Sequence, residues 1–172
     1  MPINPGPSAH DLLEDDDLLV SQSTFIGTAR ADLFLGTAAA DVAKGNGGAD
    51  ELHGAGGDDD LSGNGGDDLL YGEGGDDRLL GQGGNDSLYG NAGADVLNGG
   101  RGADTLSGGS DDDVLLGGSG ADRMSGNSGD DTLRGHTGND DMFGGAGDDR
   151  LIGGKGRDLL EGGGDDDVLL GQ

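Results

Sequence analysis

The chain has 172 residues, of which 42 are Gly, and its formal net charge at pH 7 is −26. It contains no Cys, which excludes a disulfide framework and a thiolate metal site. The negative charge excludes nucleic acid as a partner, and the apolar runs are too short for a transmembrane segment. A composition this rich in Gly and charge is typical of disordered chains, unless a regular pattern or a ligand supplies order.

Residues 1–23 are predicted to form a flexible acidic leader. The segment opens as MPINPGPS and continues as DLLEDDDLLV. It lacks a basic stretch followed by a continuous apolar run, so it does not read as a cleaved signal peptide. A short amphipathic strand or helix within residues 12–20 is an alternative that the pattern leaves open.

Residues 24–44 are predicted to be degenerate capping repeats. Two nine-residue units, GTARADLFL and GTAAADVAK, start at Gly27 and Gly36 and carry Asp32 and Asp41 at their sixth position. They lack the later Gly of the units that follow. Terminal repeats of a stacked array are commonly atypical, because one side has no neighbouring repeat.

Residues 45–170 are fourteen nonapeptides without an insertion or deletion, and the pattern continues to residue 172. Position 1 is Gly and position 6 is Asp in every unit, and position 8 is Leu in twelve units and Met in two. Disordered tracts do not place an aliphatic residue at every ninth position, so the array is predicted to fold. Position 4 is Gly except at Asp111 and Asp165, and Asp is one of the few residues that tolerate a left-handed backbone.

These units resemble the RTX calcium-binding repeat, whose pattern is G-G-x-G-x-D-x-U-x with U a large aliphatic residue. The resemblance covers residues 45–172, with weaker copies upstream. It implies an all-β fold, a parallel β-roll or solenoid of stacked 18-residue coils with calcium in the turns. Each unit would then consist of a six-residue turn, with Gly at positions 1, 3 and 4, and a three-residue strand whose position 8 faces inward.

Coils of eighteen residues place every second Asp in the same column. The resemblance implies that each Ca²⁺ lies between consecutive members of a column, which predicts about twelve ions from six gaps on each edge. Such ions would bring a charge of about +24 against the formal −26. The predicted metal ligands are Asp50, Asp68, Asp86, Asp104, Asp122, Asp140 and Asp158 on one edge and Asp59, Asp77, Asp95, Asp113, Asp131, Asp149 and Asp167 on the other.

The physical argument for a metal is independent of the resemblance. Fourteen buried aliphatic side chains cannot offset the entropy of ordering 126 Gly-rich residues. Stacked carboxylates also need a counter-charge. Oxygen ligands alone indicate a hard cation, and flexible carbonyl-rich turns favour Ca²⁺ over Mg²⁺.

We therefore expect a secreted calcium-binding module that folds on binding multiple Ca²⁺ in the extracellular medium and serves as a folding or export scaffold. The resemblance implies type I secretion, although the chain ends at Gly171 and Gln172 without an export signal. Partners other than calcium would be an extracellular polysaccharide or a fused or adjacent domain.

The chain is not expected to be an enzyme, because it has no HExxH or GxSxG motif and only three His residues. It could instead be the non-catalytic C-terminal module of a secreted enzyme. A second alternative is adhesion to a polysaccharide or cell surface. That alternative depends on a broken aromatic column at position 9 that begins with His53, Tyr71 and Tyr89.

Overall fold

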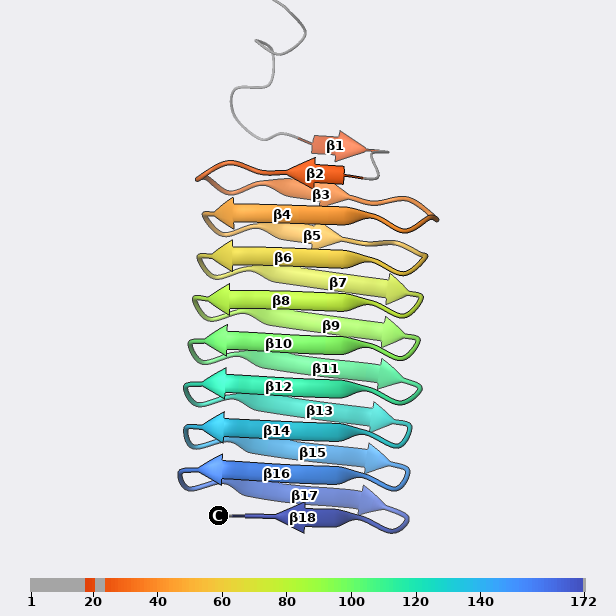
Figure 1. Cartoon of the computed structure of the whole chain (residues 1–172), viewed down its shortest axis with the longest axis vertical. Helices are drawn as coiled ribbons and strands as arrows, with labels where there is room; N and C mark the ends of the chain where they lie inside the picture. Colours follow the sequence, from red (N-terminus) through yellow and green to blue (C-terminus); the bar gives the residue numbers. More distant parts are fainter. Residues whose placement is uncertain (1–17, 21–23, 172) are drawn as a thin grey trace, which may run out of the picture.

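The computed structural model describes residues 18–20 and 24–171, and it forms a rod of parallel strands stacked along one axis (Figure 1). No helix occurs in the described residues, and accordingly none there is long and apolar enough to cross a membrane. The predicted all-β parallel solenoid is confirmed. Most of the expected leader, residues 1–17 and 21–23, lies outside the described residues, whereas residues 18–20 form a strand.

Consecutive strands alternate between two nine-stranded sheets, so that each coil adds one strand to each sheet. The odd-strand sheet consists of β1 (Leu18–Val20), β3 (Leu33–Leu35), β5 (Glu51–His53), β7 (Leu69–Gly74), β9 (Ser87–Ala92), β11 (Thr105–Ser110), β13 (Arg123–Ser128), β15 (Asp141–Ala146) and β17 (Leu159–Gly164). The even-strand sheet consists of β2 (Thr24–Ile26), β4 (Val42–Gly47), β6 (Asp60–Gly65), β8 (Arg78–Gly83), β10 (Val96–Arg101), β12 (Val114–Ser119), β14 (Thr132–Thr137), β16 (Arg150–Lys155) and β18 (Val168–Leu170).

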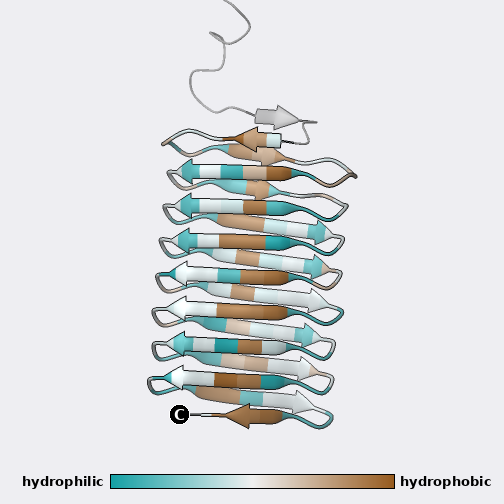
Figure 2. Cartoon of the chain, in the orientation of Figure 1, coloured by the Kyte–Doolittle hydropathy of each residue, from teal (hydrophilic) through white to brown (hydrophobic). Residues whose placement is uncertain are grey.

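The register between neighbouring strands of the array is the predicted 18 residues. Leu70 of β7 pairs with Leu88 of β9, and Leu79 of β8 pairs with Leu97 of β10. The position 8 side chains between Leu52 and Leu151 are almost fully buried between the two sheets and form one continuous core. Figure 2 shows hydrophobic residues in the strands and hydrophilic residues in the turns along both edges. The 18-residue register therefore aligns the same repeat position in neighbouring strands of each sheet.

The two capping units continue the same core with different residues. Phe25, Phe34 and Ala43 occupy the interior column on the N-terminal side of Leu52. The rings of Phe25 and Phe34 stack with their centroids 5.4 Å apart. The segment of residues 24–44 is therefore part of the stack, with two Phe and one Ala in the core where the array uses Leu or Met.

The strands of the array are longer than the predicted three residues. In β6 and the strands that follow, up to β17, pairing extends from position 7 through position 3 of the next unit, which leaves only positions 4 to 6 as the turn. The reason is that positions 2 and 3 keep the register across coils, as Asn64 pairs with Gln82 and Gly65 with Gly83. A tight three-residue turn thus presents each position 6 Asp.

The repeat positions that adopt positive φ also differ from those predicted for the glycines. Positive φ occurs at positions 2 and 4, for example 76° at Asn64 and 125° at Gly66, whereas no position 1 or position 3 residue adopts it among the described units. Asp111 and Asp165 adopt φ of 80° and 69°, so Asp substitutes for Gly at position 4 as expected. Position 1 requires Gly for space instead, because a Cβ there would collide with the Asp side chain of the same unit.

Candidate metal sites in the turns

The position 6 Asp residues lie in two columns along the two edges of the rod. The Asp50 edge, on the left in Figure 1, is where the even-numbered strands end, and the Asp59 edge is where the odd-numbered strands end. From Asp50 to Asp149 these side chains are at most 3% exposed. The sequence-predicted ligands are therefore brought together in columns and buried in the turns, although they carry charge when ionised.

One oxygen of each carboxylate is used to hold the next coil. Oδ1 accepts a hydrogen bond from the backbone N–H of the Asp one coil earlier, at 2.8 Å from Asp50 N to Asp68 Oδ1 and at 2.8 Å from Asp59 N to Asp77 Oδ1. The same bond recurs along both columns up to Asp140 N to Asp158 Oδ1 at 3.1 Å and Asp149 N to Asp167 Oδ1 at 3.0 Å. This ladder fixes the orientation of every column carboxylate.

The other oxygen has no hydrogen-bond partner in twelve of the fourteen predicted ligands. Oδ2 is buried and faces no donor in Asp50, Asp59, Asp68, Asp77, Asp86, Asp95, Asp104, Asp113, Asp122, Asp131, Asp140 and Asp149. A buried carboxylate oxygen without a donor or a cation is costly. These oxygens are therefore the atoms to which a cation would bind.

The last member of each column differs from the rest. Asp158 and Asp167 are half-buried, and their Oδ2 atoms are not among the enclosed oxygens. Asp113, which follows the Asp111 substitution, is 1% exposed and has the same environment as the other column members. The substitution at position 4 thus leaves the neighbouring candidate ligand in place.

Burial raises the pKa of the column carboxyls, because the charged form loses its hydration. The Oδ1 hydrogen bond lowers the pKa in part, and neighbouring carboxylates of the same edge raise it further. The pKa reaches about 6 in Asp50, Asp59, Asp77, Asp95, Asp122 and Asp131 and about 7 in Asp86 and Asp113, and it is also raised in Asp68, Asp104, Asp140 and Asp149.

The turns also contain backbone acceptors that are not otherwise used. In the described units from Gly45 onward, the carbonyls at positions 4 and 5 accept no hydrogen bond, whereas those at positions 3, 6 and 9 do. No group of three or more Asp, Glu, His or Cys side chains is arranged to hold a metal within the described residues. A cation in these turns would therefore combine carboxylate and carbonyl oxygens, a ligand set that suits Ca²⁺.

The capping turns supply donors to the Oδ2 atoms of their Asp residues, which the array turns do not, but Asp41 Oδ1 is buried without a hydrogen-bond partner. The backbone N–H of Thr28 donates to Asp32 Oδ2 at 2.6 Å, and that of Thr37 donates to Asp41 Oδ2 at 2.7 Å. The two Thr hydroxyls add bonds of 3.2 Å and 3.1 Å to the same oxygens. Sequence reasoning missed this role, although the signal was present: both capping units begin Gly-Thr-Ala, and no array unit has Thr at position 2.

The exposed position 5 residues form a second ladder that sequence reasoning also missed. Asp58 Oδ1 accepts from Asp76 N at 3.1 Å, and Asp112 Oδ1 accepts from Asp130 N at 2.8 Å. Asn85 makes the same bond to Ala103 N at 2.9 Å, so the ladder does not require a charge. Position 5 therefore supports coil stacking through either Asp or Asn.

The predicted aromatic column exists on the odd-strand sheet, but its rings stack on one another. The centroid of Tyr71 lies 4.7 Å from that of His53 and 5.1 Å from that of Tyr89. Further along, the Arg123 guanidinium lies 5.1 Å from the centroid of the Phe143 ring. A sugar ring would need the ring faces that these contacts use, so the column gives no support to polysaccharide binding.

A comparison with protein-family models matches the chain to the RTX calcium-binding nonapeptide repeat. Six overlapping matches span the capping units and the array, at residues 26–61, 53–88, 80–115, 89–124, 116–151 and 143–172. A comparison of the whole chain with curated proteins finds no match.

Proposed function

Because the chain belongs to the family of RTX calcium-binding nonapeptide repeats, we propose that it is a secreted module whose array folds when its Asp columns bind Ca²⁺. The observation that carries the proposal is the row of buried Oδ2 atoms without a hydrogen-bond donor. Calcium supplies the missing counter-charge when it is bound, and the remaining steps depend on residues of the chain.

The ligands that we assign are the fourteen Asp residues of the two columns and the carbonyls at positions 4 and 5. The Oδ1 ladder orients each carboxylate before metal binding. The Gly at position 1 leaves room for the Asp side chain of the same unit. About twelve ions follow from the gaps between the column members.

In the absence of a cation, the columns oppose folding. Column carboxylates with a raised pKa must either take up protons or remain charged in a buried turn. At the low calcium concentration of the cytosol the array would stay unfolded, and it would fold in an extracellular medium, where repeat modules bind with dissociation constants of about 10⁻⁴ to 10⁻³ M. Secretion by a type I system and a role as a folding or export scaffold are parts of this proposal.

The domain organisation that we propose follows from the difference in hydrogen bonding between the capping turns and the array turns. We assign residues 24–44 as a cap, because Thr28 and Thr37 donate to the Oδ2 atoms of Asp32 and Asp41, the atoms that lack donors in the array. Residues 45–172 form the calcium-dependent array, and residues 1–23 form a leader. Folding would then propagate from the cap into the array, since each coil contacts only its neighbours.

Ion counting tests the proposal. Isothermal titration calorimetry on the chelator-treated chain should give about twelve Ca²⁺ per chain at neutral pH. A Mg²⁺ titration is the control and should show weaker uptake, because octahedral Mg²⁺ does not suit carbonyl-rich turns. Uptake of only one or two ions would contradict the proposal.

A further inference from the structure

The even-strand sheet carries a basic surface on a strongly acidic chain. From β10 to β18 its outward-facing positions include Arg101, Arg134, Arg150 and Lys155 and no Asp or Glu. The odd-strand sheet over the same coils carries one cation, Arg123, whose cross-strand neighbour in β15 is Asp141, and β17 adds Glu161. The sequence has only nine Lys and Arg residues. Four of them therefore lie on the outer face of this half of the even-strand sheet.

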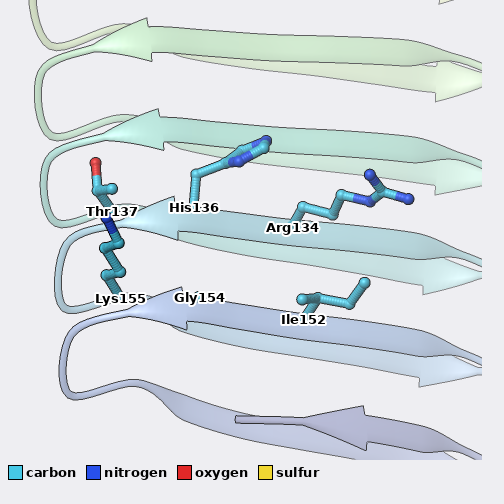
Figure 3. A pocket seen from close by; sticks show the side chains of 6 residues that line it. All are labelled: Arg134, His136, Thr137, Ile152, Gly154 and Lys155. Carbon is cyan, nitrogen blue, oxygen red and sulfur yellow. The ribbon is translucent and has the colours of Figure 1, made fainter. Parts of the chain in front are cut away.

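Part of this surface is a hollow of about 360 Å³ between β14 and β16 (Figure 3). It is lined by Arg134, His136 and Thr137 of β14 and by Ile152, Gly154 and Lys155 of β16. The lining residues are direct cross-strand pairs: Arg134 with Ile152, His136 with Gly154, and Thr137 with Lys155. Because Gly154 has no side chain, the space opposite His136 stays open.

The Arg and Lys side chains of the hollow have no paired carboxylate, although His136 interacts electrostatically with Asp140 of the adjacent turn. Within the described residues, neither Arg134 nor Lys155 forms an ion pair. Figure 3 shows Lys155 extending from β16 toward Thr137, whose hydroxyl donates to the Gly118 carbonyl at 3.3 Å. On the same sheet near the cap, by contrast, Arg78 Nη1 lies 3.0 Å from Asp60 Oδ1 of the neighbouring strand.

The turns beside the hollow do not supply the missing acid either. On the Asp50 edge, Asn139 and Arg157 occupy position 5 after β14 and β16, and Arg157 N donates to Asn139 Oδ1 at 2.9 Å. The only carboxylates in these two turns are the column members Asp140 and Asp158, which our proposed function assigns to calcium. Once calcium neutralises the columns, the hollow becomes locally positive.

The geometry points to an oxoanion site in this hollow in the calcium-loaded fold, with Lys155 at one end, Arg134 directed toward the other end and His136 between them, so that a ligand with more than one oxoanion group would span it (Figure 3). The ligand class is a sulfate, phosphate or carboxylate group, because guanidinium and ammonium groups donate charge-assisted hydrogen bonds to such oxygens. A volume of about 360 Å³ also admits the sugar unit that would carry such a group. The inference depends on the proposed function only in that calcium loading removes the competing negative charge.

The test uses sulfate, which tolerates millimolar calcium better than phosphate does. The full chain, loaded with Ca²⁺ and confirmed as β-rich by circular dichroism, is titrated with sodium sulfate while amide and His136 ring NMR signals are followed. A second titration uses dextran sulfate, with neutral dextran as its control. Shifts confined to β14 and β16 are expected, with tighter binding of dextran sulfate if a polymer is the source of the oxoanion.

The double variant Arg134→Gln and Lys155→Gln should weaken sulfate binding at least about tenfold. Arg78→Gln is the matched control, because that cation lies on the same sheet but is already paired with Asp60, and it should leave binding unchanged. No shift at β14 and β16 with either probe, or equal loss in both variants, would overturn the site. A chain that fails to become β-rich with calcium would instead contradict the proposed function, so the two failures are distinguishable.

Discussion

The two edges of the rod carry equivalent columns of buried Asp, but they differ one residue earlier in each turn. At position 5 the Asp59 edge has Asp in six of its seven array turns, whereas the Asp50 edge has one Asp together with Asn, Ala and Arg. The column carboxylates are nevertheless alike in burial, in the Oδ1 ladder and in the unpartnered Oδ2. The fold therefore fixes the environment of the buried position 6 Asp, the candidate ligand, whereas the charge of the exposed position 5 residue varies between the edges.

Because of this difference, we expect the two edges to bind calcium through the same atoms but with different strength. On the Asp59 edge, charges such as Asp58, Asp76 and Asp130 contribute to the raised pKa of the column members. The same charges attract a divalent cation. We therefore expect the Asp59 edge to bind calcium more tightly and to be more sensitive to salt.

The largest expected effect is one that both edges share, the replacement of calcium by protons. A carboxyl whose pKa rises from 3.8 to about 6 or 7 on folding, as in Asp50 and Asp113, binds its proton more tightly in the folded state. This contribution to the stability of the calcium-free fold is complete below pH 3.8 and is lost as the pH rises through about 6 to 7.

Circular dichroism of the calcium-free chain between pH 4 and pH 8 should therefore show β structure that melts as the pH increases through that range. Calcium affinity should rise over the same interval, because protons and calcium compete for the same oxygens. A calcium-free chain that gains order with increasing pH would contradict the assignment of the raised pKa values to folding.

The next largest effect concerns the columns themselves. Asp104→Asn and Asp113→Asn change the middle of each column, and each carboxylate lies between two neighbours of its edge. Each variant should bind roughly two fewer ions, with similar losses on both edges, as measured by calorimetry. The exposed Asp141 lies outside the columns, so Asp141→Asn is the control and should keep the full count. A loss on only one edge would show that the columns are not equivalent.

Exchange of the position 5 residues tests the difference between the edges. Asp112→Asn with Asp130→Asn removes two charges from the Asp59 edge, and Asn85→Asp with Asn139→Asp adds two to the Asp50 edge. Both changes keep the stacking bond, because Asn85 already makes it to Ala103 N at 2.9 Å. Calcium affinity should fall severalfold in the first variant and rise in the second, with about 1 kcal/mol per charge. Identical titrations for the two variants would refute the role of the outer charge.

The smallest effect is expected in the cap, where Thr28 and Thr37 donate to the Oδ2 atoms that have no donor in the array. Thr37→Val removes the 3.1 Å bond from the hydroxyl to Asp41 Oδ2, so hydrogen exchange at β4 should report a local loss of about 1 kcal/mol. The calcium count should not change. The control is Thr105→Val, because that hydroxyl forms no hydrogen bond within the described residues. A reduced count in Thr37→Val would mean that the cap binds calcium.

Much of the fold was predictable, because a strict nine-residue period leaves few choices. Once alternate units are assigned to opposite sheets, residues 18 apart must align, which places Leu70 beside Leu88 and Asp50 above Asp68. The strand length was not predictable in this way, since pairing through Asn64 and Gly65 depends on the neighbouring coil. The role of the position 1 Gly was also hidden, because only the folded turn places Asp50 Oδ2 against Gly45.

The candidate site could be predicted in part. The columns followed from the position 6 Asp, but the division of each carboxylate into a bonded Oδ1 and an unpartnered Oδ2 is a property of the stacked turns. The basic hollow was missed for a related reason. Arg134 and Lys155 are 21 residues apart and line the same hollow only because β14 and β16 are neighbours in one sheet.

The most direct test compares the array with and without calcium at one neutral pH. Circular dichroism at pH 7.5 should show a chain without β structure in excess chelator, and it should show the full β signal after calcium is restored. That result would mean that the two Asp columns are stable only with bound cations. Full β structure in chelator at pH 7.5 would contradict the account, because the buried carboxylates would then need no counter-charge.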